Sequence, residues 1–248
     1  MKSILLVLSL MINLFAESTV TITGEEEVFP IATIVTIEGK AKILPANSIK
    51  KHRAIIGEGL LDGDKLMTYV DTKVLITLLD DSKVILNENA ELLLSDNSTF
   101  RQEQGEIYYR ISKRAKSRGL KVETPFSIIG IKGTEFIVSF EDQGRIALNE
   151  GLIGITSRGG DFELYQEKEL SDFEQYQKQQ KQDFEAYKSK TDDTIAAYVK
   201  SFDLKQKKML IFGASKNCKA DCEQQVVEDD FSQEIVERFN SYQAMIGQ

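Results

Sequence analysis

The residues of this chain that could do chemistry are acidic pairs, two basic runs and two cysteines. Acidic pairs stand in Asp62-Gly63-Asp64 and in Asp80-Asp81, and neighbouring carboxylates can ligate calcium. A calcium loop needs more oxygen ligands at a set spacing, and Lys65 follows the first pair at once. We therefore interpret both pairs as acidic turns between strands.

Enzyme motifs are missing from the sequence. His52 is the one histidine, which rules out a multi-histidine metal site and leaves few options for a general base. There is no Gly-Lys-Ser/Thr phosphate loop and no Gly-x-Ser-x-Gly nucleophile turn. We assign no catalytic, metal-binding or cofactor-binding residue, and we expect no cofactor.

Basic residues cluster at Lys50–Arg53 and at Lys113–Arg118. Neither run contains aromatic residues that could stack on bases, and the whole chain carries a formal net charge of −8 with a pI near 5.0. This balance argues against nucleic acid as a main partner. We interpret the second run as a solvated hairpin tip, with binding to an anionic surface or an acidic partner segment as the alternative, and His52 in the first run as an ordinary loop residue.

The first sixteen residues differ from the rest of the chain. Lys2 precedes an apolar run from Ile4 to Phe15, and Ala16 ends the run. This pattern predicts a secretory signal peptide over residues 1–16, cleaved after Ala16, because the run is short for a membrane span. A membrane anchor or a buried strand is the alternative. A polar lead-in over residues 17–30 follows, and no later stretch is long and apolar enough to span a bilayer.

The two cysteines fit an exported protein. Cys218 and Cys222 stand four residues apart, so a disulfide between them would close a very small loop. Two thiols are too few for a structural zinc site. A disulfide that holds a local turn is the favoured interpretation, because an exported chain meets an oxidising compartment; free thiols are the alternative.

Residues 31–165 have the pattern of an all-β domain. Short β-branched and apolar runs alternate with turn residues every ~8–12 positions, which is typical of a sandwich, a barrel or a roll, including a solenoid-like β-roll. Glycine follows a glutamate or glutamine at Gly39, Gly105 and Gly151, each time before a predicted strand. We attribute this recurrence to turn chemistry in which glycine takes a positive φ.

The β domain is organised around residues 122–140. Two strand-like runs, 126–131 and 134–140, should be hinged at Gly130 and Gly133. In the second run Phe136, Val138 and Phe140 should face away from Glu135, Ile137 and Ser139. These residue types suit packing and turning rather than catalysis. The predicted structural motif comprises Thr124, Pro125, Gly130, Gly133, Thr134 and Phe136.

The character of the chain changes at Gln166, after which glutamine, lysine and glutamate dominate. Aromatic and apolar positions recur every eleven residues, close to three helical turns, which predicts a long helix over about 167–212. Its interaction face would comprise Phe173, Tyr176, Phe184, Tyr187 and Tyr198. We expect this coiled-coil-like helical tail, 166–248, to pack on itself, on a second copy or on a partner.

A second, shorter helix should end the chain. Asp230 is the predicted N-cap, with Gln233 in the reciprocal capping position. Apolar residues three or four apart then define one face, which should fold against the long helix. These residues are Val227, Phe231, Ile235, Phe239, Tyr242 and Ile246.

Residues 31–165 resemble a FecR-type domain. The segment from Gly59 to Thr68 is similar to the family's Gly-Asp-x-apolar-x-Thr segment. Leu78 to Leu86 resembles its strand–Asp-Gly-Ser–strand turn, with Asp81 in place of the usual glycine. Thr124-Pro125 followed by 131–136 resembles the Thr-Pro…Val-Arg-Gly-Thr-x-Phe core, with Lys132 in place of the usual arginine.

The resemblance implies a role in a bacterial cell envelope. The members that define the family relay the state of an outer-membrane receptor through a periplasmic FecR domain, a transmembrane helix and a cytoplasmic anti-sigma segment. This chain departs from that plan, so we expect a non-catalytic, exported, periplasmic binding or scaffolding module. Its partner should be an envelope protein or polymer, with self-association through the helical tail. The alternatives are a soluble periplasmic component of receptor or sigma-regulator signalling, or an enzyme acting on envelope carbohydrate.

Overall fold

The computed structural model describes residues 29–95, 98–113, 119–140, 143–167, 194–213 and 224–247. Among these residues, no helix is long and apolar enough to cross a membrane. Several predicted features lie outside the described residues: the segments 1–16 and 17–28, the basic residues 114–118, Phe173, Tyr176, Phe184, Tyr187, Cys218 and Cys222.

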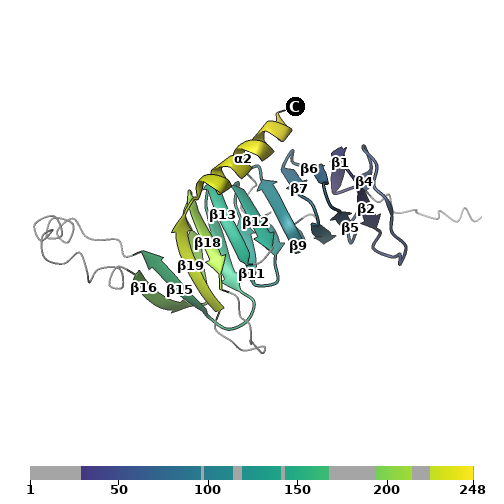
Figure 1. The fold of residues 1–248 in the computed structure, drawn as a ribbon. Helices are drawn as coiled ribbons and strands as arrows, with labels where there is room; N and C mark the ends of the chain where they lie inside the picture. Colours follow the sequence, from purple (N-terminus) through teal and green to yellow (C-terminus); the bar gives the residue numbers. More distant parts are fainter. Residues whose placement is uncertain are drawn as a thin grey trace, which may run out of the picture.

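The strands form two sheets that stack as a sandwich (Figure 1). Sheet A is antiparallel except where β15 meets β19. In spatial order it comprises β4 (Gly59–Leu60), β1 (Ala32–Glu38), β6 (Lys73–Leu78), β7 (Lys83–Leu86), β9 (Thr99–Arg110), β12 (Glu135–Phe140), β13 (Gly144–Glu150), β18 (Lys208–Phe212), β19 (Gln224–Asp230), β15 (Phe162–Glu167) and β16 (Thr194–Val199).

Sheet B runs alongside and also contains β9. Its one parallel pair among the described strands is β9 with β10. In spatial order it comprises β3 (His52–Arg53), β2 (Ala41–Leu44), β5 (Lys65–Thr68), β8 (Glu91–Ser95), β9, β10 (Leu120–Glu123), β11 (Ser127–Ile131), β14 (Ile153–Ser157) and β17 (Ser201–Leu204).

Strand β9 joins the two sheets because its halves pair in different sheets. Residues 99–104 pair with β8 and β10, whereas residues 105–110 pair with β7 and β12. The change occurs at Gly105, where φ is +76°, a value that L side chains rarely adopt. The predicted turn before residue 106 is therefore a bend inside one long strand. Gly39 and Gly151 have φ of +95° and +96°, which confirms the predicted glycine turns.

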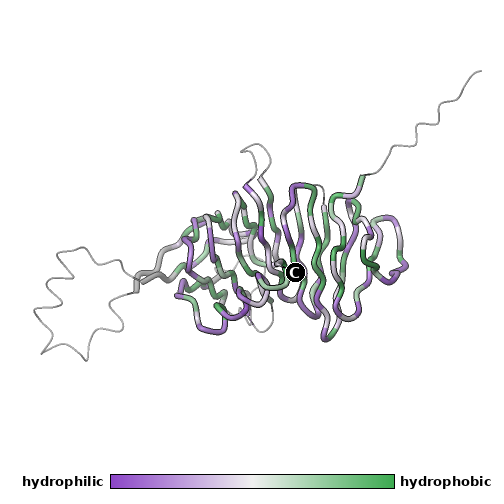
Figure 2. The backbone as a smooth tube through the Cα atoms, turned by 90° about the horizontal axis from the view of Figure 1, so that it is seen from above, coloured by the Kyte–Doolittle hydropathy of each residue, from purple (hydrophilic) through white to green (hydrophobic). Residues whose placement is uncertain are grey.

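Apolar side chains from alternate positions of both sheets fill the space between them. In Figure 2 hydrophobic residues follow the strands, and hydrophilic residues concentrate in the loops. Phe136 and Val138 of β12 lie in this core, and Phe140 packs against it, whereas Ile137 lies on the opposite, outer face of sheet A. The alternation predicted for residues 134–140 is therefore confirmed.

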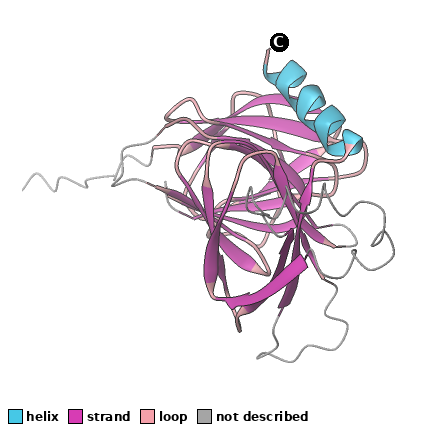
Figure 3. Cartoon of the chain, turned by 90° about the vertical axis from the view of Figure 1, so that its left-hand side faces the viewer, coloured by secondary structure: helices cyan, strands magenta, loops and turns pink. Residues whose placement is uncertain are grey.

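The outer face of sheet A is covered by helix α2 (Gln233–Ile246). Figures 1 and 3 show the helix lying outside the strand layers and across the strands of sheet A. The Ser232 side chain caps its N-terminus by accepting a hydrogen bond from the Ile235 backbone N–H at 3.4 Å. Sheet A is thus enclosed on both faces over its central strands.

The predicted long helix over 167–212 is wrong. Where the structure describes this region, residues 162–167, 194–199, 201–204 and 208–212 are strands, and no coiled coil forms there. Residues 209–212 form a continuous apolar run because the core covers one face of β18 and α2 covers the other. Since β18 pairs with β13, sheet A continues beyond residue 166, and self-association through a helical tail loses its basis.

The C-terminal helix was predicted correctly in type but not in its start or partner. Asp230 does not cap it, because Asp230 still pairs with Lys208 in the β18–β19 ladder, and its carboxylate meets the Lys208 ammonium at 2.8 Å. Val227 belongs to β19. The predicted apolar face from Phe231 to Ile246 packs on sheet A instead of on a second helix.

Candidate functional site

A single row of residues crosses the outer face of sheet A, one from each of six adjacent strands in direct register. We call it the outer row. The row spans ~24 Å at ~4.8 Å per strand, and a fourteen-residue helix is ~21 Å long, so α2 matches its length. The outer row comprises Leu75, Ile85, Tyr108, Ile137, Ala147 and Met209.

Helix α2 packs aromatic side chains on the middle of the outer row. The Phe239 and Tyr108 ring centroids lie 6.1 Å apart in an edge-on arrangement, and the Tyr242 ring lies 5.2 Å from that of Tyr108. Ile235 and Phe239 are almost fully buried. The contact between α2 and the sheet is therefore a packed apolar interface rather than a loose covering.

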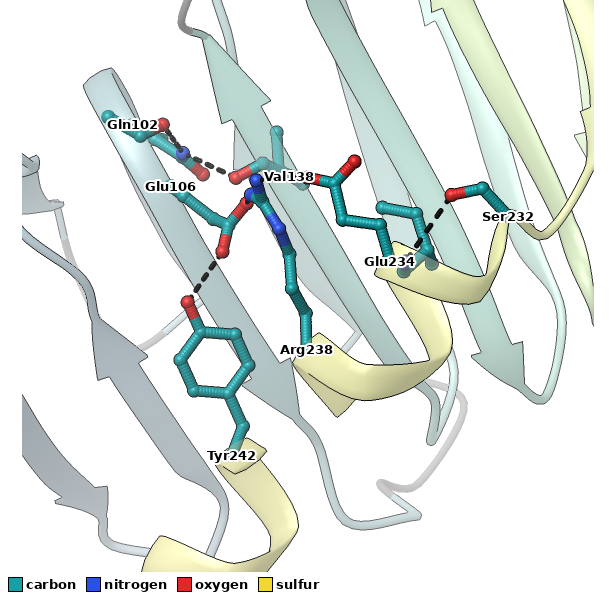
Figure 4. Close-up of polar contacts among 9 residues, drawn as sticks. Gln102, Glu106, Val138, Ser232, Glu234, Arg238 and Tyr242 are labelled. Atoms are coloured by element: carbon teal, nitrogen blue, oxygen red, sulfur yellow. Dashed lines mark hydrogen bonds and ion pairs between the residues drawn. The ribbon is translucent and has the colours of Figure 1, made fainter. Parts of the chain in front are cut away.

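A buried carboxylate, Glu106, anchors one side of this interface. It stands on β9 two residues from Tyr108, and 2% of its surface is exposed. It accepts a hydrogen bond from the Tyr242 hydroxyl at 2.5 Å and forms an ion pair with Arg238 (Figure 4). Arg238 also pairs with Glu234, one turn earlier in the helix, at 2.6 Å. Two helix side chains thus neutralise and solvate a charge that the apolar row would otherwise disfavour.

A second buried carboxylate, Glu135, anchors the opposite side. It stands on β12 two residues from Ile137, and one of its oxygens accepts hydrogen bonds from the Tyr108 hydroxyl and the Gln243 amide, both at 2.6 Å. The other oxygen accepts from the Asn149 amide at 3.0 Å. Both anchoring carboxylates are therefore saturated by hydrogen bonds within the chain.

The electrostatics of the interface favour the neutral form of Tyr108 and the charged form of Arg238. Burial raises the pKa of the Tyr108 phenol well above its ordinary value, and the hydrogen bond and charge of Glu135 raise it further. Partial burial disfavours the charged form of Arg238, but the neighbouring Glu106 and Glu234 outweigh it and raise the pKa of its guanidinium. At neutral pH Tyr108 is a hydrogen-bond donor and Arg238 is a cation.

Beneath the anchors, a buried amide holds the bend of β9. Gln102 donates hydrogen bonds to the carbonyls of Gly105 and Val138, each at 3.0 Å, and accepts one from the Tyr109 hydroxyl at 3.0 Å. The Val138 carbonyl bond ties the bend to the neighbouring strand (Figure 4). The bend and the Glu106 anchor are consecutive along β9, so the sheet crossover positions the carboxylate under α2.

Breaking the Glu106–Arg238 pair should destabilise the protein non-additively. We expect Glu106→Ala to lower the free energy of unfolding by ~3 kcal/mol, because it leaves the charge of Arg238 and the hydroxyl of Tyr242 without their partner. Arg238→Ala should cost ~1–2 kcal/mol, and the double variant should cost at least ~1 kcal/mol less than the sum. Urea unfolding of the four proteins measures this coupling.

The control is Glu234→Ala, which removes the exposed partner of Arg238 and should change stability by less than ~0.5 kcal/mol. If the losses in free energy of unfolding from Glu106→Ala and Arg238→Ala are additive, the ion pair between these two side chains does not stabilise the protein.

The predicted motif residues lie on the other side of sheet A and in sheet B. The Thr124 hydroxyl accepts from the Ser127 backbone N–H at 2.9 Å and closes the turn that contains Pro125, between β10 and β11. Gly130 lies inside β11, opposite Gly154, rather than at a hinge. Thr124, Pro125 and Gly130 thus belong to sheet B and its turn, whereas α2 packs on sheet A.

Gly133, Thr134 and Phe136 connect β11 to β12 and begin β12. Gly133 has φ of +75°, and an added Cβ would lie 2.7 Å from Lys113 Cγ. The Thr134 carbonyl accepts from the Ile111 backbone N–H at 2.9 Å. Phe136 is fully buried and stacks on Tyr109, with ring centroids 4.8 Å apart. Their described contacts are those of turning and core packing.

The acidic pairs have structural contacts within their turns. Asp64 is buried, and its carboxylate accepts from the backbone N–H groups of Leu61 at 2.9 Å and Ala46 at 3.2 Å. The Asp80 carboxylate accepts from the Ser82 backbone N–H at 3.1 Å. Asp81, which replaces the family's usual glycine, has φ of +62°. Within the described residues, no group of three or more His, Cys, Asp or Glu side chains could hold a metal ion.

Of the predicted helix face, the structure describes only Tyr198. It lies on β16, is 58% exposed, and its hydroxyl donates to Glu163 at 3.2 Å. The sequence reasoning missed Glu106, Glu135 and Arg238 as anchors. A signal existed, because Glu135 shares its strand face with the apolar Ile137, which indicates a covered face rather than a solvated one.

Comparisons with known proteins found one family model and two solved structures that resemble parts of the chain. The model of the FecR protein family matches residues 64–154, which run from the start of β5 into β14. No curated protein matches the chain. Two crystal structures of a candidate anti-sigma factor from Parabacteroides distasonis, at 2.50 Å and 1.65 Å resolution, superpose with a TM-score of 0.44 and 11% identity. Each superposition covers 70% of this chain and 62% of that chain.

Proposed function

Because the chain carries a FecR domain over residues 64–154, we propose that it is a non-catalytic binding module of the bacterial cell envelope. Its partner would be an extended segment of another envelope protein that adds a strand to sheet A. This mode of recognition uses main-chain hydrogen bonds for affinity and side-chain pockets for specificity.

The observation that carries the proposal is the edge of sheet A at β16. Among the described residues β16 pairs only with β15, so within this part of the chain it is the edge strand of sheet A. Its sequence, Thr-Ile-Ala-Ala-Tyr-Val, has no charge and no proline, although natural edge strands are usually protected by one of these or by being short. The remaining edges follow that rule: β3 and β4 have two residues each, and β17 is four residues long and contains Asp203.

The hydrogen bonds of four acidic residues bear on the carbohydrate-active alternative. Glu106 and Glu135 are held by hydrogen bonds from α2 and its surroundings, and Asp64 and Asp80 are held in turns. A glycosidase needs two carboxylates that face a substrate ~5–10 Å apart. The carbohydrate-active alternative therefore has little support in the contacts of these acids.

Photo-crosslinking at the β16 edge tests the proposal. A photoreactive phenylalanine analogue in place of Tyr198 should give a discrete crosslinked product with one protein when the chain is mixed with envelope extract. The same analogue in place of Val70, which is 66% exposed on a turn, is the control and should give none.

A charged edge provides the matched binding variant. Tyr198→Lys should reduce capture of the crosslinked protein at least ~10-fold, because a charge on an edge strand disfavours strand addition, while Val70→Lys should leave it unchanged. Crosslinking that is equal at both positions, or capture of polysaccharide alone, would overturn the proposal. If the captured protein is a receptor or a membrane-bound regulator, the periplasmic signalling role becomes the specific form of this function.

A further inference from the structure

The opposite end of the sandwich, at β1 to β4, displays apolar side chains beside cations. Ile49, Ile55 and Ile56 are 96%, 60% and 64% exposed, and the exposed Lys50, Lys51 and Arg53 lie between them in the chain. We call these six residues the isoleucine end. Exposed isoleucines are costly in water, so three of them within eight residues indicate a surface that is covered in use.

Two hydrogen-bonded turns hold the isoleucines outward. In the first, the Ser48 backbone N–H donates to the Pro45 carbonyl at 3.0 Å, and the Lys50 backbone N–H donates to the Ser48 hydroxyl at 3.0 Å, which projects Ile49. Because the turn is closed by these bonds, the exposure of Ile49 is built into the structure rather than the result of an unordered loop.

The second turn carries Ile55 and Ile56 across the end of the sandwich, from β3 of sheet B to β4 of sheet A. The Glu58 carboxylate accepts from the Ile55 backbone N–H at 3.0 Å and bonds the His52 ring at 2.7 Å. Glu58 is the one acidic residue between 45 and 58, and it is engaged inside the turn. The end therefore presents a local excess of positive charge on a chain whose net charge is −8.

The N-terminal part of the chain enters the sandwich at this same end (Figure 1). Pro30 lies against Gly59, and the Ile31 backbone N–H donates to the Leu60 carbonyl at 2.9 Å. Phe29, the first described residue, is 71% exposed. In the sequence, the apolar run from Ile4 to Phe15 ends fourteen residues before Phe29.

We propose that the isoleucine end is a membrane-binding surface that places its three cations on anionic phospholipid headgroups and its three isoleucines in the interface. Interleaved basic and large apolar residues are the combination that interfacial membrane contacts use. The surface goes beyond strand addition at β16, which lies at the far end of sheet A. A chain held at one end by a membrane would present its β16 edge away from it.

Vesicle sedimentation tests the surface directly. The chain from Glu17 onward, which keeps every described residue, should bind vesicles of phosphatidylglycerol and phosphatidylethanolamine and should bind phosphatidylcholine vesicles at least ~10-fold more weakly. Binding should weaken as salt rises from 50 to 300 mM, roughly in line with screening over a Debye length of ~10 Å or less.

Two pairs of variants separate the contributions. Lys50→Gln/Lys51→Gln should lower the affinity for anionic vesicles about 25-fold, which is about 5-fold for each cation near an anionic surface. The control Lys121→Gln/Lys132→Gln removes the same charge elsewhere and should change this affinity less than ~3-fold. Ile55→Ser/Ile56→Ser should abolish detectable binding, and Val70→Ser/Leu79→Ser, on equally exposed positions, should not. Circular dichroism checks that each variant is folded.

Failure to bind the anionic vesicles, or equal losses in the test and control variants, would overturn the membrane surface. Loss of a protein partner from the isoleucine-end variants without any vesicle binding would also overturn it and would assign the surface to that protein. The β16 crosslink is read out separately, so either proposal can fail alone.

Discussion

Replacing Gly105 with alanine should lower the free energy of unfolding by ~2–5 kcal/mol, which at the upper end leaves the protein largely unfolded at 25 °C. A Cβ on Gly105 would lie 2.5 Å from Ala90 Cα and 2.7 Å from the Asn89 carbonyl oxygen, and neither atom can rotate away. Left-handed backbone costs an L residue ~1–2 kcal/mol, and the overlap adds ~1–3 kcal/mol. The sum is a large part of a typical stability of ~5–15 kcal/mol.

The matched control is the same substitution at Gly57. Gly57 has φ of +84°, similar to that of Gly105, but an added Cβ would meet nothing within 4 Å. Gly57→Ala therefore measures the backbone strain alone and should cost ~1–2 kcal/mol. Urea unfolding of both variants isolates the overlap at the β9 bend. Equal effects at the two positions would mean that the neighbouring β8 loop yields and that the crossover is not a rigid joint.

Truncating Phe239 to alanine should have the next largest effect, ~3–4 kcal/mol. Phe239 is 3% exposed, meets Tyr108 edge-on and stacks on Phe231 with ring centroids 5.5 Å apart. Loss of a buried phenyl ring costs both its burial and the cavity it leaves, ~3–5 kcal/mol in protein cores. Val236→Ala, on the exposed side of the same helix, should change stability by less than ~0.5 kcal/mol.

Alkaline titration shows whether this loss is local or global. In the intact protein the raised pKa of Tyr108 keeps its phenol protonated at pH values near 10, where exposed tyrosines ionise. The folded state therefore holds this proton more tightly than the unfolded state, and its stabilising effect falls as pH rises above ~10. If Phe239→Ala releases α2 alone, Tyr108 should ionise closer to pH 10 while the sheets stay folded by circular dichroism. An unchanged Tyr108 titration would show that α2 remains docked.

Much of the sandwich could be predicted because one face of each strand packs on the core. Period-2 alternation put Phe136 and Val138 on the face opposite to Glu135, Ile137 and Ser139, as the structure has them, and glycine turns at Gly39 and Gly151 followed from their chemistry. Alternation separates the two faces of a strand, but it does not indicate which other element packs on the outer face. The cover for Ile137 comes from residues about a hundred positions later.

The tail was mispredicted for a related physical reason. Strand β18 is apolar on both faces because it lies between the core and α2, so its sequence has no period-2 signal. An eleven-residue recurrence then outweighed the β-branched content of Thr194–Val199. The bend in β9 was predicted as a turn between strands, because a glycine with positive φ is typical of both structures. A bend inside one strand differs from a turn only in the strands that pair with its two halves.

The long sequence separation of the α2 anchors has a kinetic meaning. Arg238 and Tyr242 reach Glu106 across 132 and 136 residues, about twice the separation of Gly144 and Phe212, which pair between β13 and β18. Such distant contacts are costly to close early in folding, and α2 has no complete surface until six strands are in register. Interactions that are absent from the transition state slow unfolding and leave the folding rate unchanged. We therefore expect α2 to set how long the folded protein survives rather than how fast it forms.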